Sequence, residues 1–208
     1  MKKGILLFDI DRTIFDTDKM SASLSEKLSD ILGKQNIAEI DRIKRDYIGS
    51  LKRDREFTPD EFCQRLAKRF GRLDVNSLLE VFYGKKSGLI YRGCVYPEFF
   101  EIFEKLRGKF RLGVYSEGTL KFQKHKFESM KISKYLEKDL VFIVPIKDNA
   151  ETLAKIPKEA VIVDDKETVC EALARDGFHP IWLNKKDDRE NKMFDTIHSL
   201  LELPDKLM

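Results

Sequence analysis

Short apolar runs alternate along the chain with longer segments of mixed polarity. Five runs stand out, at residues 5–8, 110–116, 140–144, 160–165 and 179–183. Each run contains β-branched or aromatic residues and is bounded by charged or turn-forming residues, a pattern typical of strands that are buried on both faces of a parallel sheet. We therefore predict five buried strands.

Several segments between these runs have the periodicity of amphipathic helices. Residues 97–109 carry an apolar face that includes Phe99 and Ile102, and residues 168–177 end at a glycine. Strands that alternate with helices in this way indicate an α/β domain built on a parallel sheet.

Residues 16–92 break the alternation because their pattern is helical throughout. Thr58 is a suitable N-cap for a helix with Pro59 in its first turn, and Gly71 is a suitable end for it. We predict a helical insert between the first strand and the rest of the sheet, with helices at residues 21–33, 58–71 and 75–84.

Composition and charge favour a soluble globular protein. The chain has 208 residues, enough for one core domain that carries a smaller second lobe, and 36% of them are charged. Basic and acidic residues are nearly equal in number, so the formal net charge of +3 does not by itself indicate a nucleic-acid partner. No segment has the roughly 20 apolar residues of a membrane helix, and the first residues lack the long apolar run of a signal peptide. We expect a cytoplasmic protein that does not contact a membrane.

Cysteine and histidine spacing gives no sign of a disulfide framework or a zinc site. The three cysteines are far apart and include no CxxC pair, so we expect ordinary thiols. The three histidines also lack the spacing of metal ligands. These residues are Cys63, Cys94, Cys170, His125, His179 and His198.

Acidic residues gather where the predicted strands end. Asp9 and Asp11 follow the first strand, Ser116 ends the second, and Asp164 and Asp165 end the fourth. Because ligands bind beyond the carboxyl ends of parallel strands, we expect these groups to converge. Clustered carboxylates raise one another's pKa, and Mg²⁺, which prefers oxygen ligands and phosphate, would relieve that cost. The alternative is that each acid merely caps the helix after it.

Four segments together resemble the motifs of the haloacid dehalogenase-like superfamily of phosphohydrolases. They are "FDIDRTI" with Asp9, Asp11 and Thr13, "LGVYSEG" with Ser116, a lysine, and "VIVDDKE". The resemblance covers nearly the whole chain. It implies a three-layer Rossmann-like core at residues 1–15 and 93–208, with an all-helical cap at residues 16–92.

The resemblance also implies roles for the acids. Asp9 would be the nucleophile that forms an aspartyl-phosphate, and Asp11 would be the general acid and base. Mg²⁺ would be held by the Asp9 side chain, the Asp11 backbone carbonyl and Asp165, while Asp164 would share the metal or support it from the outer shell. Phosphate oxygens and substrate would meet Ser116, backbone N–H groups near Ile10 and Asp11, and the motif residues Thr13, Glu117 and Gly118.

The lysine of the third motif has three candidates. Lys147 follows the third strand and lies 17 residues before Asp164, which suits the superfamily pattern. Lys124 and Lys126 follow Ser116 on a predicted helix and compete with it. We favour Lys147, whose charge would offset that of the nucleophile and the phosphate.

Two positions depart from the superfamily pattern. Arg12 stands where many members have glycine, and a role neutral for function is expected for it. Val169 stands where an acid often follows the metal ligand, so Glu167 is the alternative source of that contact.

An acid at Asp11 favours a phosphatase over a dehalogenase, because an alkoxide leaving group needs a proton and a halide does not. We expect a small phosphorylated metabolite as substrate, such as a sugar phosphate, phosphoglycolate or a nucleotide. A phosphomutase and a catalytically silent binding domain remain alternatives. The basic segment 42–55 would suit a phosphatase acting on nucleic-acid ends, but no aromatic and basic binding platform stands out, and a solvated helix face is the simpler interpretation of the segment. Helix capping is expected of Asp16 and Asp18.

Overall fold

The computed structural model describes residues 3–52, 56–71 and 74–207. The chain divides into two compact units. Unit 1 comprises Met1–Asp16, Val95–Glu117 and Ile132–Met208, and unit 2 comprises Thr17–Cys94 and Gly118–Lys131. The assignment of residues 16–92 to a cap stays a prediction. The segment from Gly118 to Lys131, which the sequence analysis assigns to the core, groups with unit 2.

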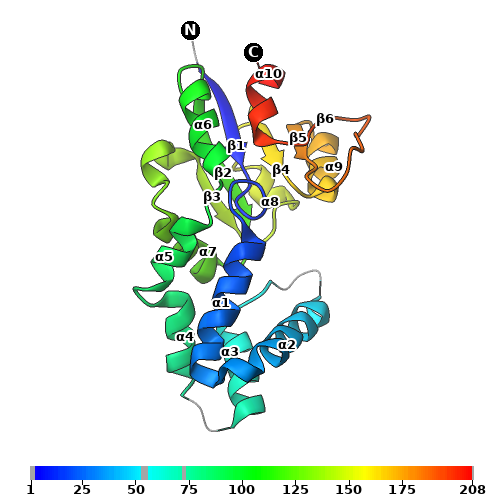
Figure 1. Cartoon of the computed structure of the whole chain (residues 1–208). Helices are drawn as coiled ribbons and strands as arrows, with labels where there is room; N and C mark the ends of the chain where they lie inside the picture. The colour runs from blue at the N-terminus through cyan, green and yellow to red at the C-terminus, as the bar shows by residue number, and fades with distance from the viewer. Residues whose placement is uncertain (1–2, 53–55, 72–73, 208) are drawn as a thin grey trace. The chain divides into compact units, whose positions relative to one another are not determined.

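Unit 1 is built on one parallel sheet, as Figure 1 shows. Neighbouring strands follow the order β3-β2-β1-β4-β5-β6, and every pairing is parallel. The α/β fold class is therefore confirmed. The strands are β1 (Gly4–Phe8), β2 (Phe110–Glu117), β3 (Val141–Val144), β4 (Val161–Asp164), β5 (His179–Leu183) and β6 (Asp195–Ile197).

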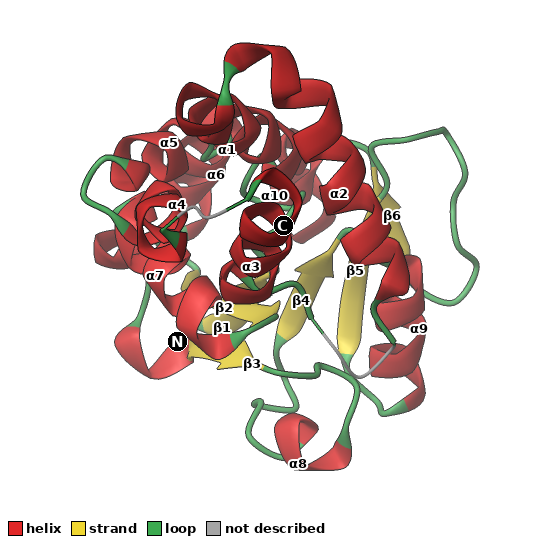
Figure 2. Ribbon diagram, turned by 90° about the horizontal axis from the view of Figure 1, so that it is seen from below, coloured by secondary structure: helices red, strands yellow, loops and turns green. Residues whose placement is uncertain are grey.

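Helices cover both faces of this sheet, and strand β1 shows how. Ile5 and Leu7 belong to a buried cluster that includes side chains from two helices, α8 (Ala150–Leu153) and α9 (Glu167–Arg175). Phe8 lies on the opposite face, since successive side chains alternate, and its ring packs edge-on against Phe99 of α6 at 6.0 Å. Figure 2 shows α9 beside β5. The remaining elements of unit 1 are α6 (Pro97–Leu106), α10 (Leu203–Leu207), η2 (Ser133–Tyr135), η3 (Lys138–Leu140) and η4 (Leu200–Glu202).

All the regular secondary structure among the described residues of unit 2 is helical, as the periodicity predicts. Thr58 caps helix α3, because its hydroxyl accepts the Glu61 N–H at 3.2 Å, and Gly71 ends the helix with a φ of 78°. Aromatic rings fill the interior, with Phe57, Phe62 and Phe82 in mutual contact. The helices are α1 (Thr17–Leu32), η1 (Lys34–Asn36), α2 (Ile37–Ser50), α3 (Pro59–Phe70), α4 (Val75–Tyr83), α5 (Ser87–Gly93) and α7 (Leu120–Met130).

Other expectations from the sequence can be compared with the described residues. The three cysteines are buried free thiols. The basic segment lies partly on α2, where Arg42 pairs with Glu39 at 2.7 Å and Lys44 pairs with Asp41 at 2.8 Å; residues 53–55 lie outside the described part. Asp18 is in the first turn of α1, where a negative charge is favourable, and Asp16 directly precedes that helix. Among the described helices, none combines the length and the apolar character needed to span a bilayer.

Candidate active site

The site lies at the carboxyl edge of the sheet in unit 1. Strand β1 runs between β2 and β4, so the residues at the ends of these three strands become neighbours. Asp9 follows β1, and its N–H donates to the Val163 carbonyl of β4 at 2.8 Å. Asp164 is the last residue of β4, and Ser116 lies near the end of β2. The sheet order therefore brings together the strand-end groups that the sequence singles out.

Lys147 forms a buried ionic triad with Asp9 and Asp164. Its Nζ lies 2.5 Å from Asp9 Oδ1 and 2.5 Å from Asp164 Oδ2. The three residues are 2%, 6% and 0% exposed, respectively, which means that the ammonium is shared by two carboxylates in a nearly dry environment. Lys126, by contrast, belongs to unit 2, where its Nζ lies 5.8 Å from the centroid of the Phe122 ring.

Burial dominates the electrostatics of the acids. It raises the pKa of Asp9 from 3.8 to about 7; Lys147 opposes this rise, while Asp164 and Asp11 add to it. Burial and the neighbouring Asp164 raise the pKa of Asp165 from 3.8 to about 6. Burial alone would lower the pKa of Lys147, but Asp164 and Asp9 outweigh that effect and raise it. Three carboxyl groups, those of Asp9, Asp164 and Asp165, thus share this edge with the Lys147 ammonium, which contacts two of them.

The raised pKa of Asp9 predicts how stability depends on pH without metal. Because the folded protein binds the Asp9 proton more tightly than the unfolded chain does, this contribution is complete below pH 3.8 and is lost as pH rises to about 7. In a chelator, we expect the free energy of unfolding of wild type, minus that of Asp9→Asn, to fall across this range and then level off. Urea denaturation at a series of pH values measures it. A difference that grows with pH would mean that Lys147, and not burial, controls Asp9.

The carboxylates fit a hard divalent cation. Carboxylate oxygens of Asp9, Asp164 and Asp165 lie within 4.8 Å of one another. Both Asp164 oxygens already accept hydrogen bonds, one from Lys147 and one from the Lys166 N–H at 2.9 Å. The Asp165 carboxylate has no hydrogen-bond donor among the described residues. Hard oxygen donors with excess negative charge suit Mg²⁺, with Asp9 and Asp165 better disposed than Asp164 to bind it directly.

Two buried hydroxyls at this edge have no hydrogen-bond partner within the described residues. They are Ser116 Oγ and Thr13 Oγ1, and both residues are 0% exposed. A buried polar group without a partner costs free energy, so it usually marks a place where a ligand or water binds. Each hydroxyl can donate to an anionic oxygen, which makes this pair suitable for a phosphoryl group.

The backbone of Arg12 has a conformation that favours glycine. Its φ is 59°, in the left-handed region that glycine adopts at the least cost. The turn is held by hydrogen bonds from the Arg12 N–H to the Phe15 carbonyl and from Lys185 Nζ to the Arg12 carbonyl, at 2.8 and 3.1 Å. Asp11 itself is half-buried and forms a bridge with Phe15. The turn that carries Asp11 is thus fixed by interactions on both of its sides.

Other residues singled out in the sequence have partners of different kinds. The Glu117 carboxylate accepts the Lys147 N–H at 2.7 Å, and Gly118, in unit 2, has a φ of 148°. The Ile10 carbonyl accepts the Ile14 N–H at 3.2 Å. Val169 packs in the buried cluster beneath the sheet. Glu167 pairs with Arg189 at 2.9 Å and accepts from Asn191 at 3.0 Å, so its carboxylate is engaged away from the acids.

Trp182 is a neighbour of the site that the sequence analysis missed. Its indole N–H donates to the Asp165 carbonyl at 3.1 Å, and the residue is 4% exposed on β5. The Arg189 guanidinium lies 4.9 Å from its ring centroid. The signal was available, since Trp182 is the one tryptophan of the chain and lies in the strand next to the acid pair. Its fluorescence is therefore a natural reporter for Asp165.

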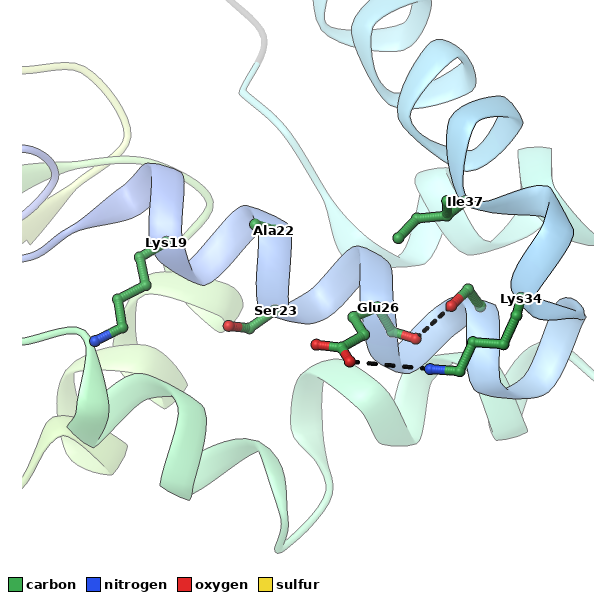
Figure 3. A pocket seen from close by; sticks show the side chains of 7 residues that line it. Lys19, Ala22, Ser23, Glu26, Lys34 and Ile37 are labelled. Atoms are coloured by element: carbon green, nitrogen blue, oxygen red, sulfur yellow. Dashed lines mark hydrogen bonds and ion pairs between the residues drawn. The ribbon is translucent and has the colours of Figure 1, made fainter.

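A separate hollow of about 470 Å³ lies on unit 2, lined by residues of α1 and of the segment that follows it (Figure 3). The Glu26 carboxylate lies 3.9 Å from Lys34 Nζ, and the Ser29 hydroxyl donates to the Glu26 carbonyl at 2.7 Å. These polar groups satisfy one another. The lining of the hollow includes one carboxylate, that of Glu26, and no acidic cluster like that of Asp9, Asp164 and Asp165, which is why we place the functional site in unit 1.

Comparison with known proteins adds a fold but no closely related sequence. No protein-family model and no curated protein sequence matches the chain. Among solved structures, a HAD phosphatase from Thermococcus onnurineus is 27% identical, with 98% of this chain and 97% of that chain covered and a TM-score of 0.60. The L-2-haloacid dehalogenase from Xanthobacter autotrophicus is 13% identical, with 99% and 98% covered and a TM-score of 0.68.

A third structure concerns the metal. YfnB from Bacillus subtilis, described as a HAD-hydrolase bound to magnesium, is 18% identical, with 100% of this chain and 99% of that chain covered and a TM-score of 0.63. Matches of this length support the same fold over the whole chain. They include both a phosphatase and a dehalogenase, so the choice between these activities depends on the residues of the site.

Proposed function

We propose that this chain, which has the haloacid dehalogenase-like fold as its motifs suggest, is a Mg²⁺-dependent phosphatase acting on a small phosphate monoester. The observation that carries the proposal is the buried group of Asp9, Lys147 and Asp164 at the carboxyl edge of the sheet. It presents a carboxylate nucleophile beside a fixed positive charge. A sugar phosphate, phosphoglycolate or a nucleotide would be a substrate of suitable chemistry.

In the first step, a carboxylate oxygen of Asp9 attacks phosphorus. The bond between phosphorus and the leaving oxygen breaks, and Asp11 donates its proton to that oxygen, which leaves as an alcohol. The product on the protein is an aspartyl-phosphate on Asp9. The hydroxyls of Ser116 and Thr13 are the proposed donors to the phosphoryl oxygens, because both are buried without a partner among the described residues.

In the second step, Asp11, now a carboxylate, takes a proton from water, whose oxygen attacks phosphorus. The bond between phosphorus and Asp9 breaks, inorganic phosphate leaves, and the Asp9 carboxylate is restored. Lys147 stays protonated through both steps, because Asp9 and Asp164 raise its pKa. It therefore offsets negative charge throughout, without taking part in proton transfer.

The metal would be held by the Asp9 side chain, the Asp11 backbone carbonyl and Asp165, with Asp164 oriented by Lys147 and the Lys166 N–H. When bound, Mg²⁺ would neutralise phosphoryl charge and align phosphorus with the nucleophile. Asp11 favours a phosphatase over a dehalogenase, because halide departs without a proton.

The proposal is tested with para-nitrophenyl phosphate, with Mg²⁺ and with a chelator. We expect turnover with Mg²⁺, loss of turnover in the chelator, and recovery when Mg²⁺ is returned in excess. Binding is followed separately through Trp182, whose fluorescence should change as Mg²⁺ saturates the site, because its indole N–H bonds to the Asp165 carbonyl. A matched titration with Asp165→Asn should lose the fluorescence change.

The outcomes also separate the alternatives. Metal binding without hydrolysis of this ester or of a panel of phosphorylated metabolites would favour a silent binding domain. Transfer of phosphate between positions of a sugar, without release of inorganic phosphate, would favour a phosphomutase. Turnover that does not depend on a divalent cation would overturn the proposal.

A further inference from the structure

Lys147 lies in a loop that has no regular backbone hydrogen bonding of its own. Residues 145–149 connect β3 to α8 without helix or strand. A lysine side chain has four carbons and many rotamers, so its ammonium stays on Asp9 only if its backbone is fixed. Because Lys147 is 2% exposed, its backbone N–H and carbonyl also need partners within the protein.

Both partners come from β2. The Tyr115 hydroxyl donates to the Lys147 carbonyl at 2.5 Å, and Glu117 Oε2 accepts the Lys147 N–H at 2.7 Å. Side chains two residues apart lie on the same face of a strand. Tyr115 and Glu117 therefore hold Lys147 from one face of β2, while Ser116 between them points to the other.

The environment of Tyr115 strengthens this arrangement. The residue is 0% exposed, and burial raises the pKa of its hydroxyl, which keeps it a hydrogen-bond donor. Its ring centroid lies 5.4 Å from Lys147 Nζ, within the range of a cation–π interaction. Tyr115 thus contacts Lys147 at the carbonyl and at the ammonium.

Glu117 connects the same loop to β4. Its Oε1 lies 3.7 Å from Lys166 Nζ, and the Lys166 N–H donates to Asp164 Oδ1 at 2.9 Å. The half-exposed Lys166 side chain contributes little free energy at that distance. The hydrogen bond from the Lys147 N–H, at 2.7 Å, is the shorter of these two Glu117 contacts and the one that reaches the Lys147 backbone directly.

We propose that Tyr115 and Glu117 are positioning residues that clamp the backbone of Lys147 and so hold its ammonium between Asp9 and Asp164. The effect on turnover rests on the proposed phosphatase function; the clamp itself does not. The end of β2 then has two tasks, since Ser116 faces the phosphoryl group while its two neighbours fix the lysine.

Kinetics of Tyr115→Phe, Glu117→Ala and Glu117→Gln test the effect on turnover. Loss of one hydrogen bond of about 1 kcal/mol corresponds to a several-fold to roughly tenfold lower kcat, with KM nearly unchanged, for the first two variants. Glu117→Gln should recover most of kcat, because its amide oxygen still accepts the Lys147 N–H. In a Lys147→Met background, Tyr115→Phe and Glu117→Ala should cause no further loss, because their target is gone.

The matched control is Tyr91→Phe in unit 2. Tyr91 is also 0% exposed, and its hydroxyl donates to the Phe82 carbonyl at 2.7 Å. It should lower stability about as much as Tyr115→Phe while kcat stays at the wild-type value. Equal losses of kcat in Tyr115→Phe and Tyr91→Phe would mean that both variants lose activity only because the fold is less stable, which would overturn the positioning role of Tyr115.

Hydrogen exchange of the Lys147 amide tests the clamp without any substrate. We expect faster exchange in Glu117→Ala, by about tenfold, and wild-type exchange in Glu117→Gln and Tyr91→Phe. An unchanged exchange rate of the Lys147 amide in Glu117→Ala overturns the clamp. If wild type turns over no ester but the amide responds as expected, the phosphatase proposal fails and the clamp stands. If Lys147→Met abolishes turnover while Tyr115→Phe and Glu117→Ala match wild type, the positioning inference fails and the function stands.

Discussion

Asp9→Asn should hydrolyse para-nitrophenyl phosphate at least about a thousandfold more slowly than wild type, because an amide oxygen is a poor nucleophile and the two-step route is closed. The fold should persist, since asparagine has the same shape and its amide oxygen can still accept from Lys147, which keeps Asp164 as its ionic partner. The measurement is the steady-state rate in excess Mg²⁺, together with thermal unfolding of both proteins.

Two further variants test whether the loss of hydrolysis rate is specific to Asp9 and whether Asp11 protonates the leaving group. Asp139→Asn makes the same chemical change on the surface of unit 1, where Asp139 pairs with Arg111, and should leave the rate unchanged. Asp11→Asn should lose more rate on an alkyl phosphate than on the aryl ester, because nitrophenolate leaves without a proton and an alkoxide does not. Full activity in Asp9→Asn would exclude Asp9 as the nucleophile.

The α/β architecture of the core could be predicted because its longer strands and helices each have a hydrophobic pattern that can be recognised within a short segment of sequence. Runs such as residues 140–144 are short and rich in β-branched and aromatic residues, which favours buried strands, and their alternation with helices indicates a parallel sheet. Strand β6 escaped prediction, since Asp195–Ile197 is three residues long and pairs at the edge. Helix α7 was expected in the core, but it groups with unit 2, and only the folded chain shows this because side-chain packing between distant segments decides it.

The candidate site divides in the same way. Strand order alone brings the ends of β1 and β4 together, so Asp9 and Asp164 become neighbours by topology. The spacing that singles out Lys147 does not show which residues fix its backbone. Its contacts with Tyr115 and Glu117 span 32 and 30 residues of sequence, and only the fold brings these residues together. Nor does the sequence alone reveal the turn at Arg12, whose left-handed backbone is stabilised by Lys185, a residue 173 positions away.

Lys147→Met should destabilise the metal-free protein by about 3–5 kcal/mol at pH 8, because it removes the ammonium that directly contacts both Asp9 and Asp164. Methionine has a similar length, so packing changes little. The loss should shrink at pH 5, below the raised pKa of about 7 for Asp9, because that carboxyl then carries a proton. Urea denaturation in a chelator at the two pH values measures it.

Mg²⁺ distinguishes this electrostatic loss from a packing defect. A cation that binds only the folded protein stabilises it by mass action, and it should stabilise Lys147→Met more than wild type, since it supplies the positive charge that the variant lacks. Lys126→Met removes another fully buried lysine, in unit 2, and its stability should not respond more than that of wild type. An equal response to Mg²⁺ in all three proteins would mean that Lys147 does not compensate the charge of the carboxylates proposed to bind the metal. A larger response confined to Lys147→Met would identify the lysine and the ion as two sources of charge for the same carboxylates.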